Sequence, residues 1–198
     1  MRNSKAIALL IGPLVGCYAQ LENPSISVSH PLCTGNTNCI PGGPGVPLSV
    51  TPAGGNTFTV PFGDQPLLKP SSSLGPATLN TSLLMNRATF DMRTAGADFM
   101  NVDSVTLRAA LQPANPPGSD PCATASNCVT IATYVKSTDG TAMQQIVLKG
   151  NGSDLVNYIN NTSHDLTIQI QATGFAPNTP WNADVSMDMA LKARANFP

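Results

Sequence analysis

The sequence contains little charge. Only 11% of its 198 residues are Asp, Glu, Lys or Arg, and Glu22 is the single glutamate, whereas about 25% is usual in globular domains. Ten basic residues nearly balance eleven acidic ones, so the sequence has no basic stripe for nucleic acid and no polybasic run for anionic lipid. Ser, Thr, Asn and Gly must therefore cover much of the surface, as is typical of exported β-proteins.

Residues that commonly carry catalysis are also scarce. Histidine occurs only as His30 and His164, and both lie in polar sequence that predicts solvated side chains. The sequence has no nucleophile elbow, S-x-x-K box, H-E-x-x-H motif, phosphate loop or dinucleotide fingerprint. Asp184 and Asp188 share one face of an expected strand, which indicates solvated carboxylates rather than an acid–base pair across a cleft. We therefore predict a protein that is not an enzyme and has no cofactor or metal site.

Residues 1–16 have the features of an export leader. Arg2 and Lys5 precede the ten-residue apolar run 6–15. As a helix this run would be about 15 Å long, half of a ~30 Å hydrocarbon core. It is too short to span a membrane and right for the apolar region of a secretory signal. The sequence therefore predicts that the chain is exported.

The end of this leader carries a four-residue motif. Leu14-Val15-Gly16-Cys17 resembles the lipobox of bacterial lipoprotein precursors. The resemblance implies that the Cys17 thiol receives a diacylglyceryl group, that cleavage occurs just before it, and that the new amine is acylated, for example with palmitate. Two or more acyl chains make a stable membrane anchor. By resemblance to the enteric sorting pattern, Tyr18 favours the outer membrane. The alternative is cleavage after Ala19, which would release a secreted soluble protein.

Four further cysteines form two pairs with the same spacing, Cys33-x5-Cys39 and Cys122-x5-Cys128. An even number of cysteines in an exported protein predicts disulfides. Of the three possible connectivities we favour the local one, 33–39 and 122–128. A disulfide that closes a loop of this size stabilises the folded chain by roughly 2.4 kcal/mol. This is enough to fix the loop but is not what stabilises the fold as a whole. Zinc is the alternative, but this spacing exceeds the usual C-x2-4-C.

The chain after the leader divides into two parts. Residues 17–52 are rich in Pro and Gly and contain the first cysteine loop, so they cannot form a core of their own. They are predicted to be a tether between the lipid and the domain, or an extension along the domain surface, in which Ser25–Ser29 could add an edge strand. Residues 53–198 are predicted to be a single domain.

This second part alternates apolar and polar residues with a period of two, the pattern of half-buried strands. Leu84, Leu111 and Val135 fall in the inward-facing sets, and one helical turn is expected after Ser153-Asp154. Strands each with one apolar face require a partner layer, so we predict an antiparallel β-sandwich of Ig-like or jelly-roll type. The predicted strands are 57–62, 84–92, 105–111, 129–135, 143–148, 166–172 and 185–195.

Trp181 is the single tryptophan and follows a proline in Pro180-Trp181-Asn182. It is a candidate ligand-binding residue, because sugar-binding sites use aromatic platforms, or it packs over the end of the fold. The preferred hypothesis is a lipid-anchored cell-envelope protein with a non-catalytic structural or protein-binding domain. Its partners would be the membrane, through the anchor, and an envelope protein, with no nucleic acid. The alternative is a glycan-binding module that uses Trp181.

Overall fold

The computed structural model shows an all-β antiparallel protein, which confirms the predicted class. It describes residues 18–35, 37–48, 57–61, 71–74, 77–111, 119–160, 163 and 165–196. Cys17 and His164 lie outside these ranges. The described strands are β1 (Tyr18–Pro31), β2 (Thr57–Pro61), β3 (Ser71–Leu74), β4 (Ala77–Met92), β5 (Val102–Ala110), β6 (Cys128–Val135), β7 (Gln145–Gly150), β8 (Asp165–Gly174) and β9 (Ala183–Asn196).

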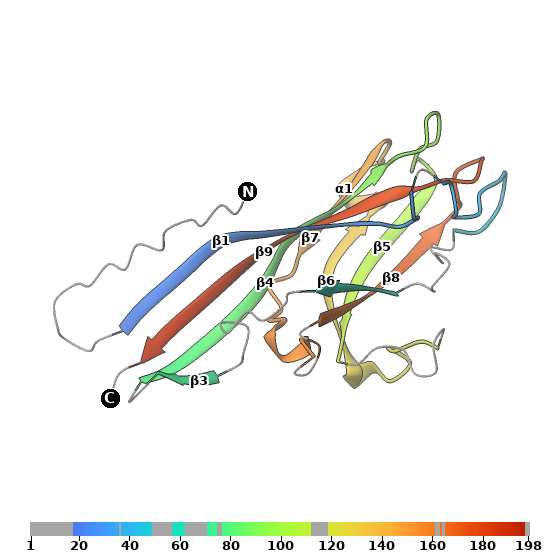
Figure 1. The fold of residues 1–198 in the computed structure, drawn as a ribbon. Helices are drawn as coiled ribbons and strands as arrows, with labels where there is room; N and C mark the ends of the chain where they lie inside the picture. The colour runs from blue at the N-terminus through green and yellow to red at the C-terminus, as the bar shows by residue number, and fades with distance from the viewer. Residues whose placement is uncertain are drawn as a thin grey trace.

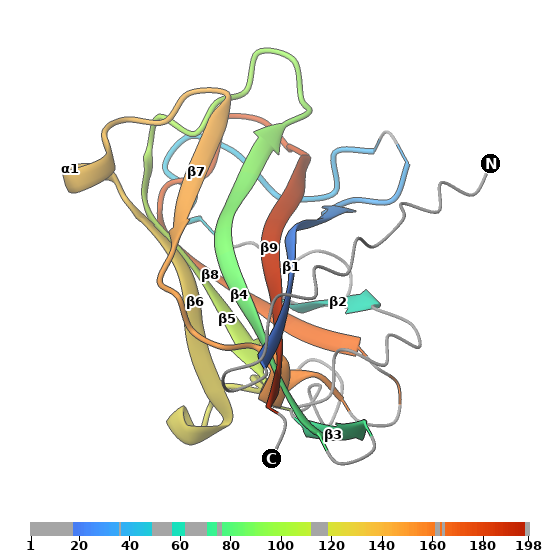
Figure 2. The same cartoon turned by 90° about the vertical axis from the view of Figure 1, so that its left-hand side faces the viewer.

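All of the described strands belong to one continuous sheet. The strand order is β1-β9-β4-β7-β6-β5-β8-β2, and β3 pairs with the outer part of β4. The sheet curls so that β5 and β8 lie behind β4 and β9 (Figure 2). A division into two sheets of Ig-like or jelly-roll type is not confirmed, since hydrogen-bonded neighbours connect every strand along a single path. The boundary at residue 52 stays a prediction because residues 49–56 lie outside the described ranges.

The two edges of this sheet approach one another at an aromatic pair. His30 on β1 stacks on Phe58 of β2, with ring centroids 4.6 Å apart and ring planes 13° apart. β1 and β2 are the two ends of the strand order, so this contact bridges the seam of a nearly closed sheet. The prediction of a solvated His30 is wrong, because its ring faces the interior and is half-buried. Burial lowers the pKa of His30 below its ordinary value of 6.5.

Strand β9 supplies the centre of the hydrophobic core. It pairs with β1 from Asn196 to Asp184 on one side, and with β4 from Asn196 to Ala183 on the other. Its inward residues alternate as the sequence pattern predicts. Those buried are Val185, Met187, Met189, Leu191 and Ala193.

Three strands, β1, β9 and β4, extend beyond β7 as a ribbon, with β3 paired to the outer part of β4 as a fourth strand. β7 pairs with β4 only at residues 87–91, so the earlier part of β4 continues past it beside β9 and β1 (Figure 1). We call residues 18–23, 77–82 and 191–196 the arm. Its outer end, where Asn196 pairs with Tyr18 on one side and with Thr78 on the other, is the arm tip.

Irregular strand pairing changes which side chains face inward. The β4–β9 register shifts between Met85 and Arg87, so Leu83 and Met85 are buried while Leu84 is only half-buried. A bulge adds one residue and reverses the alternation. The inward prediction for Leu84 is therefore wrong.

The same correction applies at β5 and β6. Their register shifts between Leu107 and Arg108, and Val135, predicted to face inward, is exposed. Tyr134 is buried in its place and its hydroxyl donates to the Gly140 carbonyl at 2.7 Å. Leu111, also predicted inward, lies past the end of β5 and is exposed.

The helical pieces are short. The predicted turn after Asp154 is present as the 3₁₀ turn η3 (Val156–Tyr158). The turns η2 (Ala125–Asn127) and α1 (Lys136–Asp139) were not expected as helix, and β3 forms where no strand was predicted. None of the helices in the described ranges is long and apolar enough to cross a membrane.

Asp154 joins η3 to the sheet. Its Oδ1 accepts a hydrogen bond from the Leu83 N–H at 2.9 Å and another from the Val156 N–H at 3.1 Å. We expect Asp154→Ala to lower the free energy of unfolding by about 1–3 kcal/mol, because it leaves these donors unpaired. Asp154→Asn, which keeps an acceptor, should cost less, and Asp103→Ala on an exposed position should change it by about 0.5 kcal/mol or less. Urea unfolding measures all three; an equal cost for Asp154→Ala and Asp103→Ala would contradict this role.

The His30–Phe58 seam predicts a pH dependence. The unfolded chain binds a proton on His30 near its ordinary pKa of 6.5, and the folded chain binds it at a lower pKa. The contribution of His30 to the free energy of unfolding is therefore fully present above about pH 6.5. It is lost as the pH falls towards the lowered pKa of the folded state. We expect the wild type to lose more stability than His30→Phe between about pH 7.5 and about pH 5.5. Thermal unfolding at both pH values measures this, and parallel losses would refute it.

Candidate functional site

One end of the molecule gathers most of the described loops. We call it the loop end; it consists of residues 32–35, 37–48, 93–101, 136–144 and 174–182, opposite the arm tip (Figure 1). Backbone hydrogen bonds join these segments to one another, such as the 2.8 Å bond from the Phe99 N–H to the Met143 carbonyl. The loop closed by the Cys33–Cys39 disulfide lies here, and so does Trp181.

Trp181 is buried at the loop end. Only 1% of its surface is exposed, its Nε1–H donates to the Pro41 carbonyl at 3.2 Å, and its ring meets Phe99 edge-on at 5.7 Å. Its backbone N–H and carbonyl both pair with Ile40, at 2.9 and 3.1 Å. The indole therefore packs the end of the core and offers no face to a sugar, so the structure does not favour Trp181 as a glycan platform.

The structure has the local disulfide pairing that the spacing favoured. Cys33 pairs with Cys39 and Cys122 with Cys128, with Cα–Cα distances of 5.6 and 5.4 Å. Since each loop is short, neither disulfide crosses between distant strands.

The first disulfide loop is held against the neighbouring loops by backbone contacts. The Leu32 N–H donates to the Ala183 carbonyl at 2.9 Å. A Cβ added at Gly42 would overlap the backbone of Thr179, so only glycine permits this approach. The segment that follows β1 is therefore fixed on the body of the protein.

The paired acids of β9 form ion pairs. Arg93 Nε donates to Asp184 Oδ2 at 2.7 Å, and Arg87 Nε donates to Asp188 Oδ2 at 2.8 Å. The hydrogen bond from Arg87, and then that from Ser27, lowers the pKa of Asp188. These carboxylates lie on the outer, solvent-facing side of the sheet, as the sequence pattern predicted, and each is paired with an arginine.

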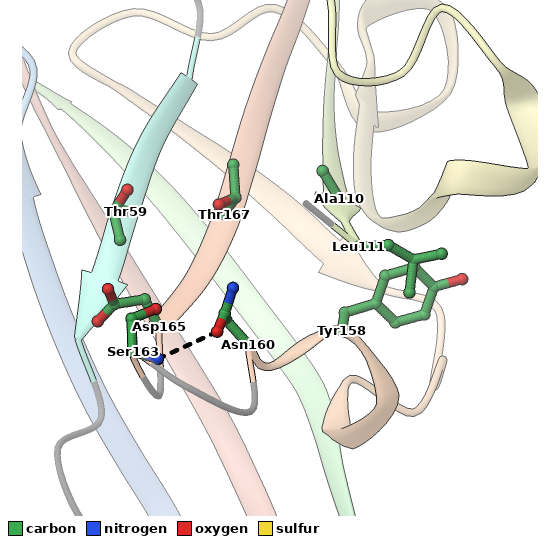
Figure 3. Close-up of a pocket in the computed structure, with 8 residues that line it drawn as sticks. All are labelled: Thr59, Ala110, Leu111, Tyr158, Asn160, Ser163, Asp165 and Thr167. Atoms are coloured by element: carbon green, nitrogen blue, oxygen red, sulfur yellow. Dashed lines mark hydrogen bonds between the residues drawn. The ribbon is translucent and has the colours of Figure 1, made fainter. Parts of the chain in front are cut away.

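A small hollow lies at the other end of the curled sheet, between β2, β8 and η3. It measures about 310 Å³, including open solvent at its mouth. Thr59 on β2 and Thr167 on β8 are direct neighbours in the sheet, and Asp165 lies beside Ser163, whose N–H donates to Asn160 Oδ1 at 3.0 Å (Figure 3). The lining residues are Thr59, Ala110, Leu111, Tyr158, Asn160, Ser163, Asp165 and Thr167.

The lining of this hollow offers hydroxyl, amide and carboxylate groups that can form hydrogen bonds. Asp165 is the one carboxylate among the lining residues. Within the described part of the chain, no three His, Cys, Asp or Glu side chains come together as metal ligands. The sequence patterns did not point to this hollow, because its residues come from distant segments.

The loop end exposes large apolar side chains that sequence reasoning missed. Met100, Met143 and Phe175 are 44%, 52% and 51% exposed. They lie on adjoining loops, since the Phe99 N–H donates to the Met143 carbonyl at 2.8 Å and the Phe175 N–H donates to the Asn101 carbonyl at 2.9 Å. Exposed apolar residues on neighbouring loops are common at protein contact surfaces. Met100 and Phe175 lie outside the predicted strands, so the periodic pattern gave no signal for them. Met143 was predicted to begin the strand 143–148, but β7 begins only at Gln145.

Comparisons with known proteins give no family. No protein-family model matches the chain, and no curated protein matches it. Among solved structures, a chain described as "nora virus structure" aligns with 98% of this chain and 66% of its own length, at 11% identity and a TM-score of 0.30. This chain thus spans slightly less than two thirds of that one. A similarity this low supports no statement about fold or function.

The buried position of Trp181 predicts a large structural cost for its removal. We expect Trp181→Ala to reduce the free energy of unfolding by about 3–5 kcal/mol, because it leaves a cavity in the core. Phe175→Ala, an exposed aromatic at the same end, should cost about 0.5 kcal/mol or less. Urea unfolding of both variants measures the difference. As the single tryptophan, Trp181 should also resist quenching by iodide in the folded protein; ready quenching, or equal costs for the two variants, would disprove its burial.

Proposed function

We propose that this protein is a lipid-anchored component of the bacterial cell envelope, attached through Cys17, with a non-catalytic domain that binds another envelope protein or serves a structural role. The observation that carries the proposal is the lipobox Leu14-Val15-Gly16-Cys17 followed directly by Tyr18, the first residue of β1. Tyr18 after the cysteine favours the outer membrane.

The position of β1 supports cleavage before Cys17. Cleavage there keeps the whole of β1, whose residues Tyr18 and Ala19 pair with Asn196 and Ala195. Cleavage after Ala19, as in the secreted soluble alternative, would remove these two residues from the strand. Cleavage before Cys17 therefore agrees with the start of β1 better than cleavage after Ala19 does.

The described surface supports a binding or structural role. The hollow beside Asp165 lacks an activated nucleophile among its lining residues, and the acids of β9 are held in ion pairs. The loop end instead exposes Met100, Met143 and Phe175. These residues lie at the end of the molecule where backbone hydrogen bonds join the loops and the Cys33–Cys39 disulfide closes one of them. A rigid surface loses little entropy on binding, which suits recognition of another protein.

The anchor can be tested with two leader variants of the full chain, expressed in a bacterium that processes lipoproteins. The wild type should sediment with membranes, and intact mass spectrometry should find a diacylglyceryl group and an N-acyl chain on Cys17. Cys17→Ala should lose the lipid and the membrane association, because no thiol remains to be modified.

The matched control is Ala19→Leu, which alters the residue needed for ordinary cleavage after Ala19. It should still be lipidated and remain with membranes. Two results would instead support the secreted soluble form. One is a wild-type protein that begins at Gln20 and carries no lipid; the other is an Ala19→Leu variant whose leader is no longer cleaved.

A further inference from the structure

The position of the proposed lipid is fixed by the first strand. Cys17 is covalently joined to Tyr18, so their Cα atoms are about 3.8 Å apart. Tyr18 is the first residue of β1 and pairs with Asn196 at the arm tip. A lipid on Cys17 would therefore be attached directly to the arm tip, with no flexible spacer between the lipid and the sheet.

The other end of β1 leads to the loop end. β1 has 14 residues, which at ~3.3 Å per residue makes it about 46 Å long. Pro31 at its far end pairs with Asp184, and the next residues form the Cys33–Cys39 loop. Because β9 and β4 run alongside β1 in continuous register apart from one bulge in each pairing, the arm is a multi-stranded ribbon rather than a single flexible chain.

Two cations are exposed among the described side chains near the arm tip. Lys192 and Arg194 lie exposed near the end of β9, with Glu22 opposite Lys192 in register. Cations near an anionic leaflet are attracted over about one Debye length.

We infer that the arm tip is the surface that faces the lipid bilayer, so that the domain stands upright with its loop end directed away from the membrane. This inference rests on the proposed lipidation of Cys17. The partner at the tip is a lipid surface carrying anionic headgroups. The exposed apolar residues of the loop end are then held about 46 Å from the tip along β1, within reach of proteins that lie beyond the headgroup layer.

Energy transfer from labelled cysteines to the membrane surface tests this placement. The full lipidated protein is reconstituted in vesicles of equal parts phosphatidylcholine and phosphatidylglycerol that contain a headgroup-labelled acceptor. Asn80→Cys, an exposed position opposite Arg194 in the arm, reports on the tip. Met143→Cys, an exposed position, reports on the loop end. Each carries the same donor dye, and the four native loop cysteines are occupied in disulfides.

We expect transfer from Asn80→Cys to be several-fold more efficient than transfer from Met143→Cys. Equal transfer would mean that the domain lies flat, and stronger transfer from Met143→Cys would mean that the loop end faces the lipid; either result overturns the inference. Both variants must retain the wild-type thermal unfolding curve. Ser82→Cys and Phe175→Cys replace a variant that does not.

The same preparations separate this inference from the proposed function. If intact mass finds no lipid on Cys17 and the protein does not float with the vesicles, the anchor itself is refuted and the placement with it. If the protein is lipidated and floats but the two sites transfer equally, the anchor stands and only the upright placement fails.

Discussion

The ladder on both sides of β9 is the interaction on which the rest of the structure depends. β9 is bonded to β1 along one side and to β4 along the other, and its alternating residues from Val185 to Ala193 are buried in the core. Removing either neighbour would expose a long row of backbone donors and acceptors. Because β9 places β1, it also brings His30 to Phe58, where the two edges of the sheet meet. Closure of the sheet and position of the arm thus follow from one strand.

The features that could be predicted from the sequence are those that depend on neighbouring residues. The alternation in β9 and the spacing of the cysteine pairs lie within short windows, and the structure agrees with them. The alternation predicted for β8 holds only in part, since Thr167 and Gln169 are buried as well as Leu166, Ile168 and Ile170. Leu84 and Val135 were assigned to the wrong face because each lies near a register shift, and a bulge depends on the partner strand. His30 was expected in solvent because Phe58, the residue that covers it, is distant in sequence and lies across the seam. β3 was missed because Ser71–Leu74 has almost no apolar alternation.

The candidate sites separate in the same way. The Leu14–Cys17 motif is a linear signal and requires no knowledge of the fold, so the sequence alone can suggest it. The environment of Trp181 is instead built by Pro41 and Phe99 from two other loops, and only the assembled structure shows that its indole is enclosed. The position of Lys192 and Arg194 beside the start of β1 likewise emerges from the fold, since strand pairing places Glu22 opposite Lys192 and Gln20 opposite Arg194.

The pairing of β1 with β9 also determines when the chain can fold. The Ser27 hydroxyl donates a hydrogen bond to Asp188, which lies 161 residues later in the sequence. Strand β1 therefore lacks its partner β9 until almost the whole domain has been synthesised. Contacts of such long range slow folding and leave strand edges open to aggregation in the meantime. A chain synthesised from its amino end therefore carries β1 without its partner strand for most of its synthesis.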